Sequence, residues 1–187
     1  MISKIGIIGA GTMGCGIAQI ASQHGHDVIV VDKEKLQLEK AKAGLEKILS
    51  RLCEKERITA EDKTAILNRI SFTSELNQLT DSDLVIEAIV ENINVKHEVF
   101  KTVEQIVSES CLLASNTSSL SIASIGSALT KSNRCIGIHF FNPAPLMPLV
   151  EIIPAVQTDE QTINSAVDLI KKWGKTVVKC KDTPGFI

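Results

Sequence analysis

Short apolar runs alternate with longer amphipathic segments along the chain. Because each run is too brief for a helix, strands are predicted at 4–8, 28–31, 70–73, 83–88, 111–115, 135–139, 149–153 and 176–178. The clearest helical pattern is at 34–51, where Leu38, Ala41 and Leu45 share one face and lysines occupy the other. Further helices are predicted around 17–21 and at 92–107, 121–127 and 159–173.

Capping signals mark where two helices should begin. Thr59 and Asp62 have the spacing of a capping box, which predicts a short helix ending near Arg69. Thr158 is predicted to cap the helix at 159–173. The alternation of strands and helices predicts an α/β fold of the Rossmann type, with a doubly wound, mostly parallel sheet. Such sheets bind ligands at the carboxyl ends of their strands.

Composition narrows the functional classes. The 187 residues are 44% hydrophobic, enough for the core of one good-sized domain. A formal net charge of −2 gives no electrostatic reason to expect a nucleic-acid or membrane partner, and no apolar stretch has transmembrane length. Since no signal-peptide pattern precedes the first strand, a cytoplasmic location is expected. The five cysteines are scattered, so neither a disulfide framework nor a metal site is expected.

A glycine-rich turn joins the first predicted strand to the helix after it. Gly9, Gly11 and Gly14 stand at the GxGxxG spacing of dinucleotide-binding proteins. The first glycine permits the tight turn, the second lets the backbone approach a pyrophosphate, and the third lets helix and strand lie close together. Free N–H groups at the start of the helix would favour the phosphates. This context predicts a bound dinucleotide.

Asp32 ends the second predicted strand, where an acidic residue commonly binds the adenosine ribose. A carboxylate there favours NAD over NADP, because it would repel a 2′-phosphate. The neighbouring Lys33 leaves NADP open. FAD is also an alternative, since flavoproteins use the same fold.

Polar residues follow three later strands of the predicted sheet. They are Glu87 and Glu91, then Asn116, Thr117 and Ser118, then His139, Asn142 and Pro143. Because the carboxyl ends of parallel strands share one edge, these groups are expected to converge on one crevice. A histidine, a serine hydroxyl and an asparagine in that place suit hydride transfer to or from an alcohol carbon.

Several motifs together resemble the L-3-hydroxyacyl-CoA dehydrogenase family, in particular its short-chain bacterial members, the 3-hydroxybutyryl-CoA dehydrogenases. The similar stretches are 8–18, 85–91, 114–120, 139–145, 149–151 and 183–186, so they span the chain. The resemblance implies NAD as cofactor and an acyl-CoA substrate. It also implies interconversion of 3-hydroxyacyl-CoA and 3-ketoacyl-CoA, as in fatty-acid and butanoate metabolism.

The resemblance assigns catalytic roles by position. His139 would be the general base that takes the hydroxyl proton, which suits an imidazole because it exchanges protons near neutral pH. Glu151 would orient the ring and stabilise its charged form. Ser118 would hydrogen-bond the substrate oxygen beside the nicotinamide.

Binding roles follow from the same resemblance. The cofactor would contact the turn, Asp32 and the residues near the nicotinamide: Gly9, Ala10, Gly11, Thr12, Met13, Gly14, Asp32, Glu91, Lys96, Ser118 and Asn142. Lys55 is a weak candidate for the CoA portion. Each role has a plainer alternative. His139 could be a core histidine, Glu151 a surface carboxylate, Ser118 a helix cap, Asn142 a turn residue and Lys96 a solvated charge.

The domain organisation is expected to follow the family. Residues 1–183 would form the NAD-binding domain, and 184–187, with Pro184 and Gly185, would start the hinge to a helical domain absent from this chain. In the family that domain covers the acyl group and forms the homodimer. Two other functions stay open: a dehydrogenase of a sugar acid or another small hydroxy acid, and a non-catalytic nucleotide-binding protein.

Overall fold

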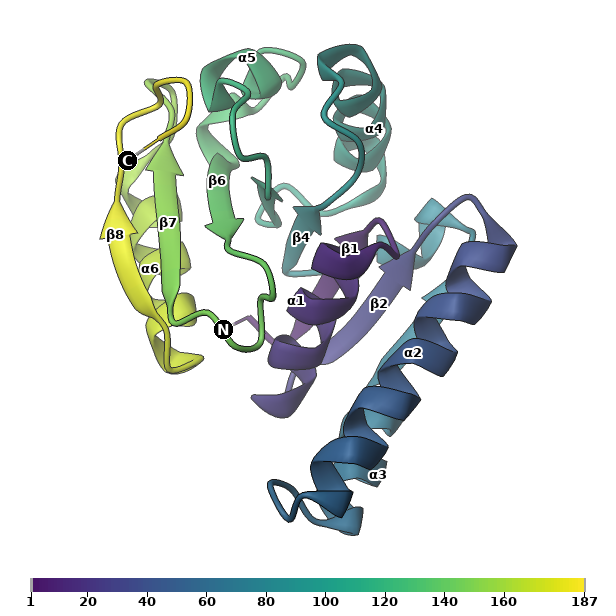
Figure 1. The fold of residues 1–187 in the computed structure, drawn as a ribbon. Coiled ribbons are helices and arrows are strands. Elements are labelled where there is room, and N and C mark those ends of the chain that lie inside the picture. The colour runs from purple at the N-terminus through teal and green to yellow at the C-terminus, as the bar shows by residue number, and fades with distance from the viewer. Residues whose placement is uncertain (1, 187) are drawn as a thin grey trace.

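The computed structural model describes residues 2–186, which form one sheet with the strand order β3-β2-β1-β4-β5-β6-β7-β8 (Figure 1). The strands are β1 (Lys4–Ile8), β2 (Asp27–Val31), β3 (Ile70–Thr73), β4 (Leu84–Glu87), β5 (Leu112–Ser115), β6 (Cys135–Phe140), β7 (Leu149–Pro154) and β8 (Thr176–Lys179). Neighbours are parallel except for β6 and β7, which are antiparallel. The predicted Rossmann-type, mostly parallel sheet is confirmed.

Helices cover both faces of the sheet. They are α1 (Thr12–Gln23), α2 (Lys35–Glu54), α3 (Ala60–Asn68), α4 (Ile93–Ile106), α5 (Ile122–Gly126) and α6 (Glu160–Lys172), with 3₁₀ turns η1 (Leu76–Leu79) and η2 (Ser132–Arg134). Apolar side chains of α1, α2, α3 and α6 pack into one core cluster, and those of α4 and α5 pack into the other. Alternating strand residues supply both clusters, as the two-residue period of a strand requires.

Two capping predictions have different outcomes. The capping box is confirmed, because the Asp62 N–H donates to Thr59 Oγ1 and the Thr59 N–H donates to Asp62 Oδ2, both at 3.0 Å. The prediction for Thr158 is wrong. Helix α6 starts one residue later, where Asp159 Oδ1 accepts from the Thr162 N–H at 2.7 Å. The Thr158 hydroxyl instead donates to the Cys135 carbonyl at 2.6 Å.

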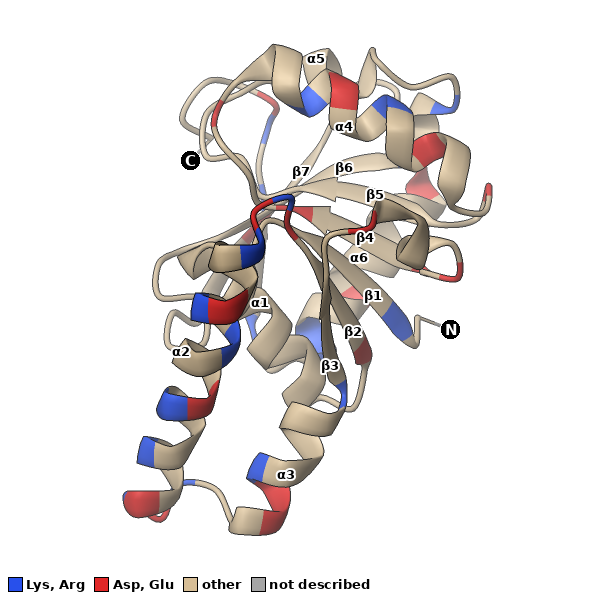
Figure 2. Cartoon of the chain, turned by 90° about the vertical axis from the view of Figure 1, so that its right-hand side faces the viewer, with Lys and Arg blue, Asp and Glu red and all other residues tan. Residues whose placement is uncertain are grey.

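Charged residues lie more often on the helices than on the strands, and the cysteines are free thiols (Figure 2). Charged positions are frequent along α2 and also occur on α3 and α4, whereas the strands are mostly uncharged (Figure 2). All five cysteines are free thiols, and burial raises the pKa of Cys111 and Cys135 to about 12. Within residues 2–186, no helix is long and apolar enough to cross a membrane, and no cluster of metal-binding side chains occurs.

Candidate active site

The turn between β1 and α1 needs its glycines for steric reasons. Gly9 has φ 108°, and a Cβ there would lie 2.5 Å from the Ala88 carbonyl oxygen. A Cβ on Gly14 would collide with the carbonyl oxygen of Gly9. Gly11 is different, since a Cβ there would meet nothing within 4 Å. The space above Gly11, at the amino end of α1, is therefore open to a ligand's phosphates.

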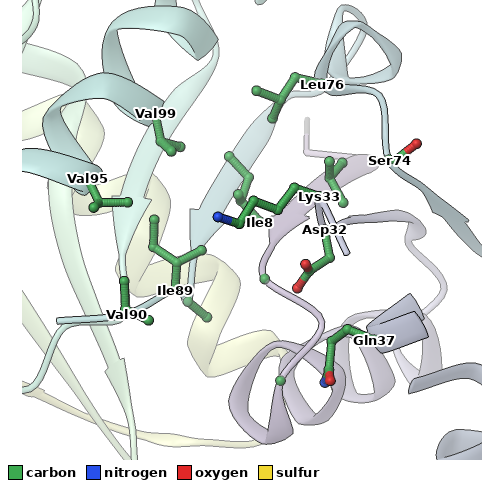
Figure 3. A pocket seen from close by; sticks show the side chains of 14 residues that line it. Ile8, Asp32, Lys33, Gln37, Ser74, Leu76, Ile89, Val90, Val95 and Val99 are labelled. Atoms are coloured by element: carbon green, nitrogen blue, oxygen red, sulfur yellow. The ribbon is translucent and has the colours of Figure 1, made fainter. Parts of the chain in front are cut away.

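A cavity of about 650 Å³ lies beside this turn (Figure 3). Asp32 points into it, with Oδ2 accepting from the Ala10 N–H at 2.8 Å and Oδ1 accepting from the Glu34 N–H at 3.0 Å. Gln37 Nε2 donates to the Ala10 carbonyl at 2.8 Å, which ties α2 to the same turn. The carboxylate is thus fixed at the wall where an adenosine ribose would lie.

The opposite wall of this cavity is apolar. It is formed by Ile89, Val90, Val95 and Val99, while Lys33 extends over Ile8 (Figure 3). An apolar slot with one fixed carboxylate is what the adenosine half of a dinucleotide needs. The turn, the open space above Gly11 and this cavity together fit NAD.

A second cavity, of about 340 Å³, lies next to the first. Both are lined by Ala88 and Ile89. Its walls bring together five of the predicted site residues: Met13, Glu91, Ser118, His139 and Asn142. They come from α1 and from the segments at or after the ends of β4, β5 and β6. The expected convergence at the carboxyl ends of the strands is therefore confirmed for these segments, and Asn116 also lines the cavity, whereas Glu87, Thr117 and Pro143 do not.

His139 and Glu151 form a close pair at this cavity. They lie opposite each other in the antiparallel β6–β7 ladder, and His139 Nδ1 is 2.6 Å from Glu151 Oε2. Their side chains are 15% and 3% exposed. The buried carboxylate accepts a hydrogen bond from Nδ1–H, so Nε2 is left as the ring's lone-pair acceptor. The phenyl ring of Phe141, with its centroid 4.8 Å from that of the imidazole, flanks the histidine.

Cys180 contacts the same carboxylate, which sequence reasoning did not anticipate. Its Sγ lies 3.5 Å from Glu151 Oε1. Burial raises the pKa of the Cys180 thiol to about 11, and the hydrogen bond and negative charge of Glu151 add to the rise. The thiol therefore stays protonated near neutral pH and donates to Glu151.

Lys96 is completely buried rather than solvated. Its ammonium lies 2.6 Å from Glu87 Oε1 and 3.2 Å from Glu91 Oε1, and Glu91 is 42% exposed beside the second cavity. The contact between Lys96 and the cofactor stays a prediction. Lys96 would affect the cofactor indirectly, by holding Glu91 in place. Sequence reasoning noted Glu87 but gave it no role. The available signal was Lys96 itself, which interrupts the apolar stripe of Ile93, Phe100 and Val103.

Lys55 lies away from both cavities. It follows the last residue of α2, is exposed, and α2 runs away from the carboxyl end of β2 (Figure 1). A helix of 20 residues is about 30 Å long. The structure does not bring Lys55 to the crevice, and its CoA contact stays a prediction.

The turn, the cavities and the strand order define a Rossmann dinucleotide-binding domain. Residues 4–183 match the family described as 3-hydroxyacyl-CoA dehydrogenase, NAD binding domain. The chain belongs to this family, and its cofactor is NAD.

Individual relatives support the family assignment. A probable 3-hydroxybutyryl-CoA dehydrogenase of Deinococcus radiodurans is 46% identical and covers 98% of this chain. The mitochondrial hydroxyacyl-coenzyme A dehydrogenase of Homo sapiens is 44% identical over the whole chain. The chain spans 66% and 62% of these two proteins. A crystal structure of 3-hydroxybutyryl-CoA dehydrogenase from Escherichia coli K12 matches this chain with a TM-score of 0.98 and 37% identity. The match covers all of this chain and 40% of the Escherichia coli chain.

Proposed function

We propose that the protein containing this chain is an NAD-dependent 3-hydroxyacyl-CoA dehydrogenase that acts on short chains such as 3-hydroxybutyryl-CoA. One observation carries the chemistry. His139, paired with the buried Glu151, lines the same cavity as Ser118 and Asn142, beside the dinucleotide turn. The names of the relatives support the acyl-CoA substrate.

The protein's own residues handle the proton. His139 Nε2 takes the proton of the substrate's 3-hydroxyl group, and Glu151 holds the Nδ1 proton and offsets the positive charge that the ring gains. Ser118 donates to the substrate oxygen and holds it near the histidine. Bound NAD supplies the acceptor for the hydride from C3. In the reverse direction, protonated His139 returns its proton to the forming alkoxide.

The cofactor contacts divide between the two cavities. Gly9, Ala10, Gly11, Thr12 and Gly14 would hold the pyrophosphate, and Asp32 would hold the adenosine ribose. Met13, Glu91, Ser118 and Asn142 would contact the nicotinamide end, with Lys96 fixing Glu91. Lys55 remains a proposed CoA contact. The open apolar cavity around Asp32 supports the adenosine assignment.

The longer relatives support a wider organisation. We infer that residues 1–183 are the NAD-binding domain and that 184–187 lead into a hinge. A helical domain beyond it would cover the acyl group and form a homodimer in a cytoplasmic enzyme. Size-exclusion chromatography of the natural full-length polypeptide tests the dimer.

A substrate panel tests the function. NADH oxidation is measured with acetoacetyl-CoA, with acetoacetate, and with a keto sugar acid, in the natural full-length polypeptide. We expect rapid oxidation only with the CoA thioester. Oxidation by a CoA-free acid would favour the small hydroxy acid alternative. Intact NADH binding without oxidation by any of the three would favour a non-catalytic nucleotide-binding role.

A further inference from the structure

Beneath the second cavity lies a buried network of charged and hydroxyl groups. Lys96 and Glu87 are both fully buried, at the start of α4 and the end of β4. The Ser115 hydroxyl, at the end of β5, donates to Glu87 Oε2 at 2.7 Å. The Ile89 N–H donates to Glu87 Oε1 at 2.7 Å. Because each charged group in the network has a partner, the network forms a rigid support for the segments packed against it.

Thr117 connects this base to the segment that carries Ser118. Its hydroxyl donates to Glu91 Oε2 at 2.5 Å, and its N–H donates to Ser115 Oγ at 3.2 Å. Its side chain oxygen also accepts the Leu120 N–H at 3.0 Å and the Ser119 N–H at 3.4 Å. One hydroxyl thus uses its single donor and both acceptor positions.

These bonds fix the turn 117–120 from within. A threonine oxygen that accepts from the residues two and three positions ahead stabilises a tight turn without regular secondary structure. Thr117 is 1% exposed, so water cannot replace its partners. Ser118, the next residue, is exposed and faces the second cavity.

We propose that Thr117 is a positioning residue for the reaction. Its hydroxyl holds the Ser118 turn at a fixed distance from Glu91. The substrate oxygen that Ser118 binds and the nicotinamide that Glu91 contacts therefore keep a constant position relative to each other. This inference rests on the proposed dehydrogenase function. A displacement of about 1 Å between reacting groups lowers turnover by on the order of 100-fold, so the hydroxyl should matter to rate more than to binding.

The test compares Thr117→Val, which loses the hydroxyl but keeps the shape, with Thr117→Ser, which keeps the hydroxyl. Thr158→Val is the matched control. The Thr158 hydroxyl likewise donates one hydrogen bond and accepts from a backbone N–H, but it lies outside both cavities. We expect Thr117→Val to lower kcat with acetoacetyl-CoA by on the order of 10- to 100-fold. The Kd for NADH should change by only about threefold, and Thr117→Ser should restore most of kcat. Thr158→Val should lower the Tm without lowering kcat.

Three results would overturn the proposal. One is wild-type kcat in Thr117→Val. Another is equal loss in Thr117→Val and Thr117→Ser, which would assign the effect to packing of the methyl group. A wild type that binds NADH but does not turn over acetoacetyl-CoA would overturn this proposal and the proposed function together. If Thr117→Val does not fold, Thr117→Ala replaces it: a kcat well below that of Thr117→Ser supports the inference, and equal kcat in Thr117→Ala and Thr117→Ser contradicts it.

Discussion

At the scale of single residues, the two key carboxylates of the site act through different partners. Asp32 accepts hydrogen bonds from backbone N–H groups of the glycine turn and of the start of α2, so its carboxylate is fixed at the cavity wall, where we propose that it binds the ribose. Glu151 is almost fully buried and pairs with His139. The first should govern cofactor affinity, and the second should govern the rate.

Replacing Asp32 with alanine removes both backbone contacts and the proposed ribose contact. Hydrogen bonds to charged groups are worth about 1.5–3 kcal/mol, so NADH binding should weaken by about 10-fold or more. Asp27→Ala is the control, because Asp27 is an exposed residue at the opposite end of the same strand. Fluorescence titration with NADH measures both variants. Equal affinity in Asp32→Ala and wild type would place the ribose elsewhere.

Glu151→Gln tests the tautomer of His139, the proposed general base. The amide can donate to Nδ1 as well as accept from it, so the ring can carry its proton on Nε2, and no negative charge balances the imidazolium. We expect kcat with acetoacetyl-CoA to fall by on the order of 100-fold or more, with little change in NADH affinity. Steady-state kinetics and an NADH titration provide the two values. Retained turnover would show that the carboxylate does not orient the base.

Local sequence pattern could identify some of these residues but not others. The glycines and Asp32 follow a spacing whose physical reason is known, so pattern alone indicated them. The roles of His139 and Ser118 came from the family resemblance. The sequence places Thr117 and Glu87 at strand ends. Their hydrogen bonds, however, connect β4, α4 and β5, and a local sequence pattern cannot predict contacts between separate elements. Lys96 was expected to be solvated or to contact the cofactor, yet it is buried in an ion pair.

At the scale of elements, the strands were the most predictable part. The strand at Ile70–Thr73 has the predicted bounds, since a short apolar run between polar flanks leaves little freedom. Helix ends were less predictable. The helix predicted to end at 51 continues to Glu54, and the cap assigned to Thr158 belongs to Asp159. Neighbouring residues offer similar capping groups, and tertiary contacts decide between them.

Asp159 offers a test of how α6 is stabilised. Hydrogen bonds from Thr162, chiefly from its backbone N–H, hold the pKa of Asp159 below its ordinary value. A carboxyl whose pKa is lowered by folding stabilises the protein above the unfolded-state pKa. That stability is lost as pH falls through the folded-state pKa. Asp159→Ala should therefore cost about 1 kcal/mol at neutral pH and progressively less in acid.

Urea unfolding at neutral and acidic pH measures this difference. Asp168→Ala is the control, since Asp168 is exposed on the same helix. A cost for Asp159→Ala that does not shrink in acid would show that the carboxylate charge is not what stabilises the helix.

At the scale of the whole molecule, one contact joins the two ends of the chain on a single face of the sheet. The Trp173 Nε1–H group donates to His26 Nε2 at 3.0 Å, although the residues are 147 positions apart. His24 also stacks near the indole, with ring centroids 6.3 Å apart. Burial, and then the nearby His24, lower the pKa of His26 below its ordinary value. The neutral ring is therefore the form that the fold requires.

This contact predicts a dependence of stability on pH. The folded protein binds fewer protons at His26 than the unfolded chain does. The free energy of unfolding should therefore be greatest above the unfolded pKa of about 6.5 and fall as pH drops toward the folded pKa. Trp173 is the single tryptophan, so its fluorescence follows urea unfolding directly. His26→Gln should reduce this dependence, and His24→Gln should largely retain it. An unchanged slope in His26→Gln would contradict the assignment.

The antiparallel β6–β7 ladder brings His139 and Glu151 together, because its register sets the two residues opposite each other. The sequence predicts only a mostly parallel sheet, because the local pattern of a strand does not determine its direction relative to its neighbour. The resemblance supplied the pairing of these residues, and the β-ladder explains it.

The proposed mechanism is tested most directly by comparing wild type and His139→Ala in acetoacetyl-CoA-dependent NADH oxidation, using the natural full-length polypeptide. We expect rapid oxidation by the wild type and a loss on the order of 100-fold or more in the variant, with NADH affinity retained, because general base catalysis typically contributes that much. Unchanged turnover in His139→Ala would contradict the proposed mechanism.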